Sequence, residues 1–178
     1  MSVIRHRIAV PSTLTVVTAL LLPLTCASGP GAPASRVGSA GVTALLPRGW
    51  HALPVVAPAP GMHVGDPVTR IVAASASIGL GRGCNELDYS FSSTAVALVV
   101  LEWVRPTPGR LPLRPRRFTS KNLAIRPPPA IECFSGPGGV IQFTDHGRRF
   151  AAFLLLGRRA SPRLADRARR VLDTLRVD

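Results

Sequence analysis

The sequence predicts an α+β fold, in which an antiparallel β-sheet carries an α-helix packed on it near the C-terminus. Short apolar runs rich in β-branched residues, separated by Gly and Pro turns, recur from residue 42 onward and predict strands. The segment "GGVIQFTDHGRRFAAFLLLG" holds two such runs around a polar turn, which predicts a hairpin. The last segment instead repeats its apolar residues at helical spacing.

Residues 1–27 have the composition of a secretory signal peptide. Arg5 and Arg7 provide a positive start, and the run from Ile8 to Leu24 carries no charge. The alternative is a membrane anchor, but Pro11 and Pro23 limit the best helical stretch to about 17 Å, against a bilayer core of about 30 Å. We therefore expect an extracytoplasmic protein without a spanning helix in its mature form.

Cys26 follows the apolar run directly and has two possible fates. A bacterial lipid-attachment motif asks for Leu and then two small residues before the cysteine, and Pro23, Leu24 and Thr25 depart from it at all three positions. Ordinary signal-peptidase cleavage accepts the small residues around Thr25 and Ala27. We favour a freely secreted protein and keep a lipid on Cys26 as the alternative.

The chain has three cysteines, an odd number for an exported protein. Cleavage or lipidation removes Cys26 from pairing and leaves Cys84 and Cys133. In an oxidising compartment this pair is expected to form a disulfide, which closes a loop of about 50 residues and is worth about 4 kcal/mol. Two separate buried thiols are the alternative. Cys-x-x-Cys spacing, which would suggest redox catalysis or zinc, is absent.

Residues 28–41 consist mainly of Gly, Ala, Ser and Pro and predict a flexible tether, so we expect one domain over residues 42–178. The run from Val42 predicts a short strand that ends at the turn residues Pro47 and Gly49. Trp50 follows this turn and is expected to anchor the core.

The middle of the chain predicts two further strands and a long connection. Thr69–Leu80 reads as one strand, and Ser93–Val104, rich in β-branched residues, reads as the central strand. Val55–Val68 is expected to be loop. Arg105–Pro129 is rich in Pro and Arg, which favours polyproline II or irregular structure.

The C-terminal part predicts the hairpin and the helix. The hairpin strands are Val140–Thr144 and Arg149–Leu156, with Gly147 where a positive φ is needed. Ser161 is suited to cap the helix, and Pro162 to its first position. One apolar stripe is expected to face the sheet: Leu164, Ala168, Val171, Leu172 and Leu175.

The segments "LPRGW", "FTDHGRRFAAFLLLG" and "VLDTLRVD", together with the spacing of the cysteine pair, resemble a group of uncharacterised small secreted proteins and lipoproteins of actinobacteria. The Leu-Pro-x-Gly-Trp start and the final strand, hairpin and helix order also resemble, more distantly, the PsbP/Mog1-like fold. That resemblance implies an antiparallel sheet with helices and a binding role. It implies no site residues.

No motif for catalysis, cofactor binding or metal binding is present. The chain has no His-Glu-x-x-His, no Gly-x-Ser-x-Gly and no phosphate-binding loop. Glu86 and Asp88 could face the same side of a strand as an acid/base pair, although such carboxylates are more often a solvated edge. A pocket in which Glu86, Asp88 or His51 converge would favour an enzyme. We therefore expect no cofactor.

Basic residues dominate the charge of this chain, whose formal net charge is +13. Codon bias of a GC-rich gene explains much of the arginine content. One segment nevertheless holds six cations and no acid, which would suit an anionic envelope polymer or lipid headgroups: Arg110, Arg114, Arg116, Arg117, Lys121 and Arg126. Phe118 is the only aromatic residue there, so stacking on nucleic-acid bases has little support.

The sequence thus predicts an exported, non-catalytic domain that binds an anionic envelope component or an unidentified protein. A small secreted hydrolase, with a site that the sequence does not display, is the alternative.

Overall fold

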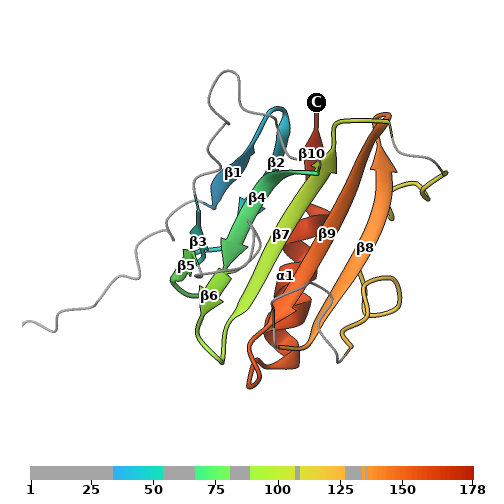
Figure 1. The fold of residues 1–178 in the computed structure, drawn as a ribbon. Coiled ribbons are helices and arrows are strands. Elements are labelled where there is room, and N and C mark those ends of the chain that lie inside the picture. The colour runs from blue at the N-terminus through green and yellow to red at the C-terminus, as the bar shows by residue number, and fades with distance from the viewer. Residues whose placement is uncertain (1–33, 54–66, 81–88, 107–108, 127–133, 135) are drawn as a thin grey trace, which may run out of the picture. The chain divides into compact units, whose positions relative to one another are not determined.

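The computed structural model describes residues 34–53, 67–80, 89–106, 109–126, 134 and 136–178 (Figure 1). Its largest element is an antiparallel sheet of five strands. In spatial order these are β3 (His51–Ala52), β4 (Val68–Ala74), β7 (Val96–Trp103), β9 (Arg148–Leu156) and β8 (Gly138–Asp145). A helix, α1 (Pro162–Asp173), packs on one face, and the predicted α+β class is confirmed.

Strand β7 is the centre of the sheet, as its sequence predicts. It pairs with β4 on one side and with β9 along its whole length on the other. Residues from Val96 to Leu101 are all buried, which explains why the strand is an uninterrupted apolar run and lacks polar alternation.

Strands β8 and β9 form the predicted hairpin. Asp145 pairs with Arg148, so His146 and Gly147 make a two-residue turn. Both have positive φ, 48° and 74°, which fits a type I′ turn and its match to the strand twist.

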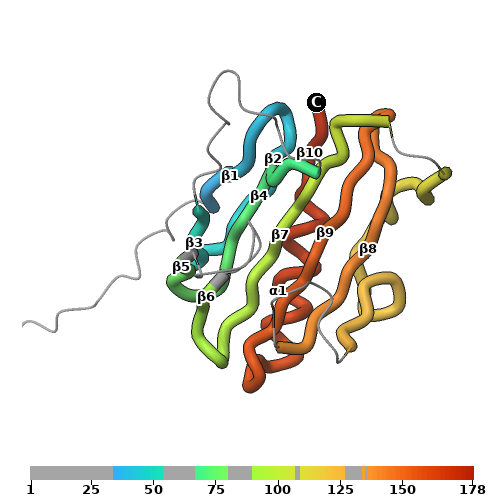
Figure 2. Tube along the Cα trace, in the orientation of Figure 1, coloured from blue at the N-terminus to red at the C-terminus, as the bar shows by residue number. Residues whose placement is uncertain are grey.

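A second, three-stranded sheet holds β1 (Ser35–Ser39), β2 (Val42–Leu46) and β10 (Arg176–Val177). Figure 2 shows how the C-terminal end of the chain returns beside β2. The predicted tether therefore differs from the structure at its end, because Ser35–Ser39 pairs with β2. Gly38 is required there: a Cβ at this position would lie 2.0 Å from the carbonyl oxygen of Val42. Compositional reasoning mistakes such small residues for a linker.

The predicted strand Thr69–Leu80 is two strands in the structure. Strand β4 ends at Ala74, and β5 (Ile78–Leu80) pairs with β6 (Tyr89–Phe91) in a separate two-stranded sheet. Ser75 marks the break, because its N–H donates to the carbonyl of Val96 and its hydroxyl accepts from the N–H of Val96. These bonds tie the chain to the start of β7 and let it change direction.

Helix α1 begins as its sequence predicts and ends at Asp173, so Leu175 of the predicted apolar stripe lies just beyond the helix, where it is nevertheless buried. Ser161 caps it by accepting a bond from the N–H of Leu164, and Pro162 occupies the first position. At the other end the Thr174 hydroxyl donates to Val171 and accepts from the N–H of Leu45 on β2, at 2.7 and 2.8 Å. One side chain thereby joins the helix end to the second sheet.

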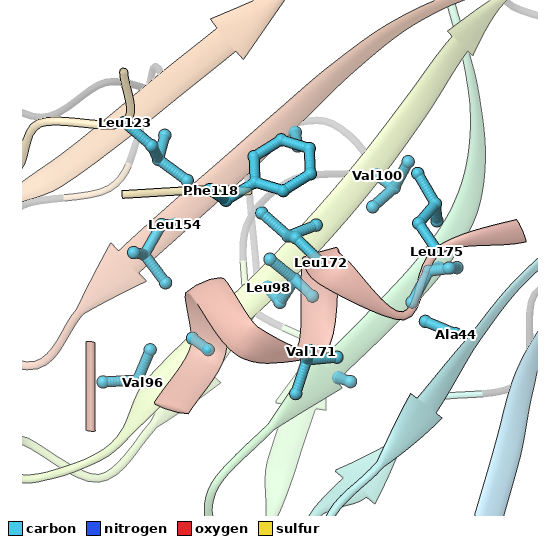
Figure 3. Close-up of a cluster of buried hydrophobic side chains, with 14 of the residues drawn as sticks. Ala44, Val96, Leu98, Val100, Phe118, Leu123, Leu154, Val171, Leu172 and Leu175 are labelled. Atoms are coloured by element: carbon cyan, nitrogen blue, oxygen red, sulfur yellow. The ribbon is translucent and has the colours of Figure 1, made fainter. Parts of the chain in front are cut away.

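The main core lies between α1 and the five-stranded sheet (Figure 3). Leu98, Val100 and Leu154 from the sheet meet Val171 and Leu172 from the helix. Full burial of one such side chain is worth roughly 1.5–3 kcal/mol. Trp50 is 8% exposed and belongs to this core, as predicted.

The opposite face of the sheet carries a second apolar cluster. It contains Val72, Ala74, Ala97, Val99, Leu101 and Leu155. Phe91 and Phe134, stacked with their ring centroids 5.6 Å apart, pack against it. Both faces of the central strands are therefore buried.

Among the residues that the structure describes, no helix is long and apolar enough to span a membrane.

Candidate functional site

Residues 109–126 run along the outer edge of β8 and onto α1, and we call this segment the strap. Near its start Leu113 bridges Thr144 on β8, and at its end Arg126 bridges Gly138. The bonds are short: the N–H of Arg114 donates to Thr144 at 2.9 Å, and the N–H of Thr144 donates to Pro112 at 2.7 Å. The two attachments hold the strap to opposite ends of one strand.

Between these attachments the strap is anchored to the helix. Phe118 is 4% exposed and packs edge-on against Phe143, and its N–H donates to the Asp173 carboxylate at 2.7 Å. Leu123 is fully buried, and its carbonyl accepts two bonds from the buried Arg169 guanidinium. The strap is irregular, as predicted, but it is a docked layer whose apolar anchors belong to the core.

Arg114 has a structural role that its sequence context conceals. Its guanidinium donates to Asp145 at 2.8 Å and to the carbonyl of Leu175 at 2.8 Å. It therefore ties the strap to both the hairpin and the end of the helix. Of the six basic residues predicted to contact a polyanion, this one is engaged within the fold.

The other five predicted contact residues are exposed on the strap. They are Arg110, Arg116, Arg117, Lys121 and Arg126. Within the described part of the chain, no hydrogen bond or ion pair is made by any of these five side chains. The backbone of Arg117 does accept a bond, from Asn122, which fixes the local turn.

Helix α1 extends this basic surface. Its solvent side presents Arg163 and Arg170 beside the residues Asp166, Arg169 and Asp173. Arg167 belongs to the same helical stripe, but its guanidinium donates to the carbonyl of Arg48, after β2, at 3.5 Å. The contacts from Asp173 to Phe118 and from Arg169 to Leu123 place this stripe next to the strap. Sequence periodicity identifies the stripe as solvent-facing, but the tertiary contacts that bring it beside the strap leave no signal in the sequence.

The carboxylates near these cations are already engaged. Asp166 accepts from Arg169 at 2.6 Å, Asp173 accepts from the N–H of Phe118, and Asp145 accepts from Arg114. Because these acids serve internal bonds, the strap and the adjoining helix side have an excess of exposed positive charge. We call this surface the basic face.

A second charged group lies inside the fold. Glu102 on β7 is 5% exposed and accepts bonds from Arg70 at 2.6 Å and from Arg148 at 2.7 and 2.8 Å. Burial acts to raise the pKa of Glu102, but the bonds and charges of Arg148 and Arg70 outweigh it and hold that pKa below its ordinary value. The bond to Glu102 raises the pKa of Arg148.

This cluster joins distant parts of the fold. Arg148 also donates to the carbonyl oxygens of Ala40 and Asp178, so it links the main sheet to the β1–β2 turn and to the segment after β10. A carboxylate that is saturated by two guanidinium groups is suited to holding strands together and not to proton transfer.

Several predicted residues lie outside the described part of the chain: Cys26, Cys84, Cys133, Glu86 and Asp88. The lipid, disulfide and acid/base predictions therefore stay predictions. His51 is exposed on β3. Among the residues that the structure describes, no three His, Cys, Asp or Glu side chains are grouped to hold a metal ion.

No protein-family model matches the chain, and neither a curated protein nor a solved structure does. The likeness to actinobacterial secreted proteins and to the PsbP/Mog1-like fold stays a prediction. What the structure defines is an α+β domain with a docked, arginine-rich strap.

Proposed function

We propose that this protein is an exported, non-catalytic binding domain whose basic face contacts an anionic component of the cell envelope. The observation that carries the proposal is the set of five exposed cations on the strap, whose side chains make no hydrogen bond or ion pair within the described residues. The exposed Arg163 and Arg170 on the adjoining side of α1 support it. Phosphate-bearing polymers and lipid headgroups share the chemistry that such a face recognises.

The docking of the strap favours binding over mere solvation. Guanidinium groups on a freely moving loop lose conformational freedom when they bind, which weakens the complex. Here the anchors Phe118 and Leu123 fix the backbone on which the cations stand. A face that is organised before binding loses less entropy on contact with a polyanion.

The location follows from the signal-like residues 1–27 and is part of the proposal. Outside the cell the available polyanions belong to the envelope. No arrangement among the described residues favours the hydrolase alternative, so one function is proposed.

The test compares two triple substitutions in the exported protein. Arg116→Ala/Arg117→Ala/Lys121→Ala removes three charges from the basic face, and Arg36→Ala/Arg158→Ala/Arg176→Ala removes three exposed charges elsewhere. Near an anionic surface each Lys or Arg contributes about 1 kcal/mol, so the first variant is expected to bind acidic vesicles and soluble polyphosphate roughly a hundredfold more weakly at low salt. The second serves as the matched control.

Arg114 is left in place, because its loss would disturb the fold through Asp145 and Leu175. Circular dichroism of both variants checks folding. If the two triple variants lost affinity equally, the net charge and not the basic face would be responsible, and the proposal would be wrong.

A further inference from the structure

Leu113 is the most exposed of the large apolar side chains that the structure describes, and Val140 on β8 is also exposed, at 41%. Leu113 on the strap is 81% exposed and Val104, just after β7, is 47% exposed. Scattered apolar residues are normal on protein surfaces, so position and not exposure alone must decide whether they matter.

The strand register shows which face of the sheet Leu113 shares. Trp103 pairs with Arg149, Arg149 pairs with Thr144, and Thr144 bridges Leu113. Paired residues of neighbouring strands lie on the same face, so Trp103, Arg149 and Leu113 share the face that carries the second apolar cluster, to which Leu101 belongs. This register does not include Val104, so it places Leu113 alone, as an exposed apolar side chain, at the edge of the sheet on the strap.

Leu113 is held in its exposed position. The carbonyl of Pro112 accepts a hydrogen bond from the N–H of Thr144, and the N–H of Arg114 donates one to the carbonyl of Thr144. The Arg114 side chain adds its bonds to Asp145 and Leu175. The backbone thus cannot turn Leu113 inward without breaking the strap's attachment to β8.

Cations surround this leucine. Arg110 precedes it, Arg116 and Arg117 follow it, and all three are exposed. On the sheet side, Arg149 donates to the carbonyl of Gly109, which keeps a guanidinium at the start of the strap. An exposed apolar side chain among arginines is typical of surfaces that lie at a lipid–water boundary.

We propose that the anionic component bound by this protein is a lipid surface, with Leu113 inserted among the acyl chains while the strap cations contact the phosphates. This inference rests on the proposed function and narrows its ligand. The strap cations favour any anionic partner. The fixed, exposed side chain of Leu113 favours a membrane over a hydrated polymer, because only the membrane offers this leucine an apolar environment.

The test uses vesicles of equal parts phosphatidylglycerol and phosphatidylcholine, with soluble polyphosphate as the second probe. In the exported protein, Leu113→Ala is expected to weaken vesicle binding about tenfold, and Leu113→Trp to strengthen it. Neither change should alter binding of polyphosphate. Acyl-chain-brominated lipids should quench the fluorescence of the Leu113→Trp variant more than that of the parent.

The outcomes separate this inference from the proposed function. If both Leu113 variants bound vesicles as the parent does, or if Leu113→Ala weakened vesicles and polyphosphate equally, the lipid inference would be wrong. Loss of both probes in Arg116→Ala/Arg117→Ala/Lys121→Ala would still support the proposed function. Unchanged binding of both probes by that triple variant would overturn the function and the inference together.

Discussion

Glu102 is the residue on which the internal charge network depends. Its carboxylate accepts hydrogen bonds from Arg70 and Arg148. Arg148 in turn donates hydrogen bonds to the backbone oxygens of Ala40 and Asp178. If Glu102 loses its charge, two partly buried guanidinium groups keep theirs without that partner, which costs more than an exposed ion pair contributes.

Glu102→Gln is therefore expected to lower the free energy of unfolding by about 2 kcal/mol, less than for a fully buried pair because both arginines are partly exposed. Urea denaturation measures this change. Arg36→Ala is the control: the Arg36 guanidinium is exposed and its bond to the Thr43 hydroxyl is at the surface, so the loss should stay under about 1 kcal/mol. Equal losses in the two variants would contradict the structural role of Glu102.

The same residue predicts a dependence on pH. Because its pKa is lowered in the folded protein, Glu102 contributes stability that is complete above the ordinary glutamate value. The contribution declines as the pH falls below that value and is lost below the pKa of the folded state. Unfolding free energies of the parent and of Glu102→Gln should therefore converge in acid, and a constant difference at every pH would contradict this.

At the residue scale, sequence reasoning succeeds where a residue acts through its neighbours in the chain. Ser161, Pro162 and Gly147 have local roles, and each is found where local rules place it. Arg114 and Arg169 bond to residues far away in sequence, so nothing around them separates them from the exposed arginines.

The strap is the element whose character depends most on tertiary contacts. Its Pro and Arg content predicts irregular structure, which the structure has, but composition does not reveal that Phe118 and Leu123 enter the core. The predictions for β7, the hairpin and helix α1 succeed because each of these elements is a continuous apolar run or repeats its apolar residues at a helical period. The strap has two anchors at no regular spacing.

Phe118→Ala is expected to lower the free energy of unfolding by about 3–5 kcal/mol, because it leaves a cavity beside Phe143 and Leu172. Leu113→Ala, in the same strap but at an exposed site, should change it by less than about 0.5 kcal/mol. Urea denaturation of the two variants measures the contrast. A Phe118→Ala protein as stable as the parent would show that the strap is not anchored.

At the scale of the whole molecule, stability is concentrated in the middle of the main sheet. Strand β7 is paired on both sides and buried on both faces, whereas β1 pairs with one strand only and has an exposed outer side. Opening of β7 requires the global loss of the core, and opening of β1 does not.

Hydrogen exchange should therefore be slowest for the amides of β7 and β9 and much faster for those of β1. If local opening of β1 costs about 3 kcal/mol less than global unfolding, its amides exchange roughly a hundredfold faster. Exchange measured by NMR would show this order. Equal protection of β1 and β7 would mean that the two sheets open together.

The position of the strap also bears on how the protein avoids self-association. An edge strand presents unpaired peptide groups on which a second molecule can add its own strand, the first step toward aggregation. The strap occupies this edge of β8 at both ends, through Arg114 at Thr144 and Arg126 at Gly138. The strap thus has two roles, because it carries the exposed cations and also covers the two ends of the β8 edge. Loss of the strap would remove the cations and expose this edge to pairing with a second molecule.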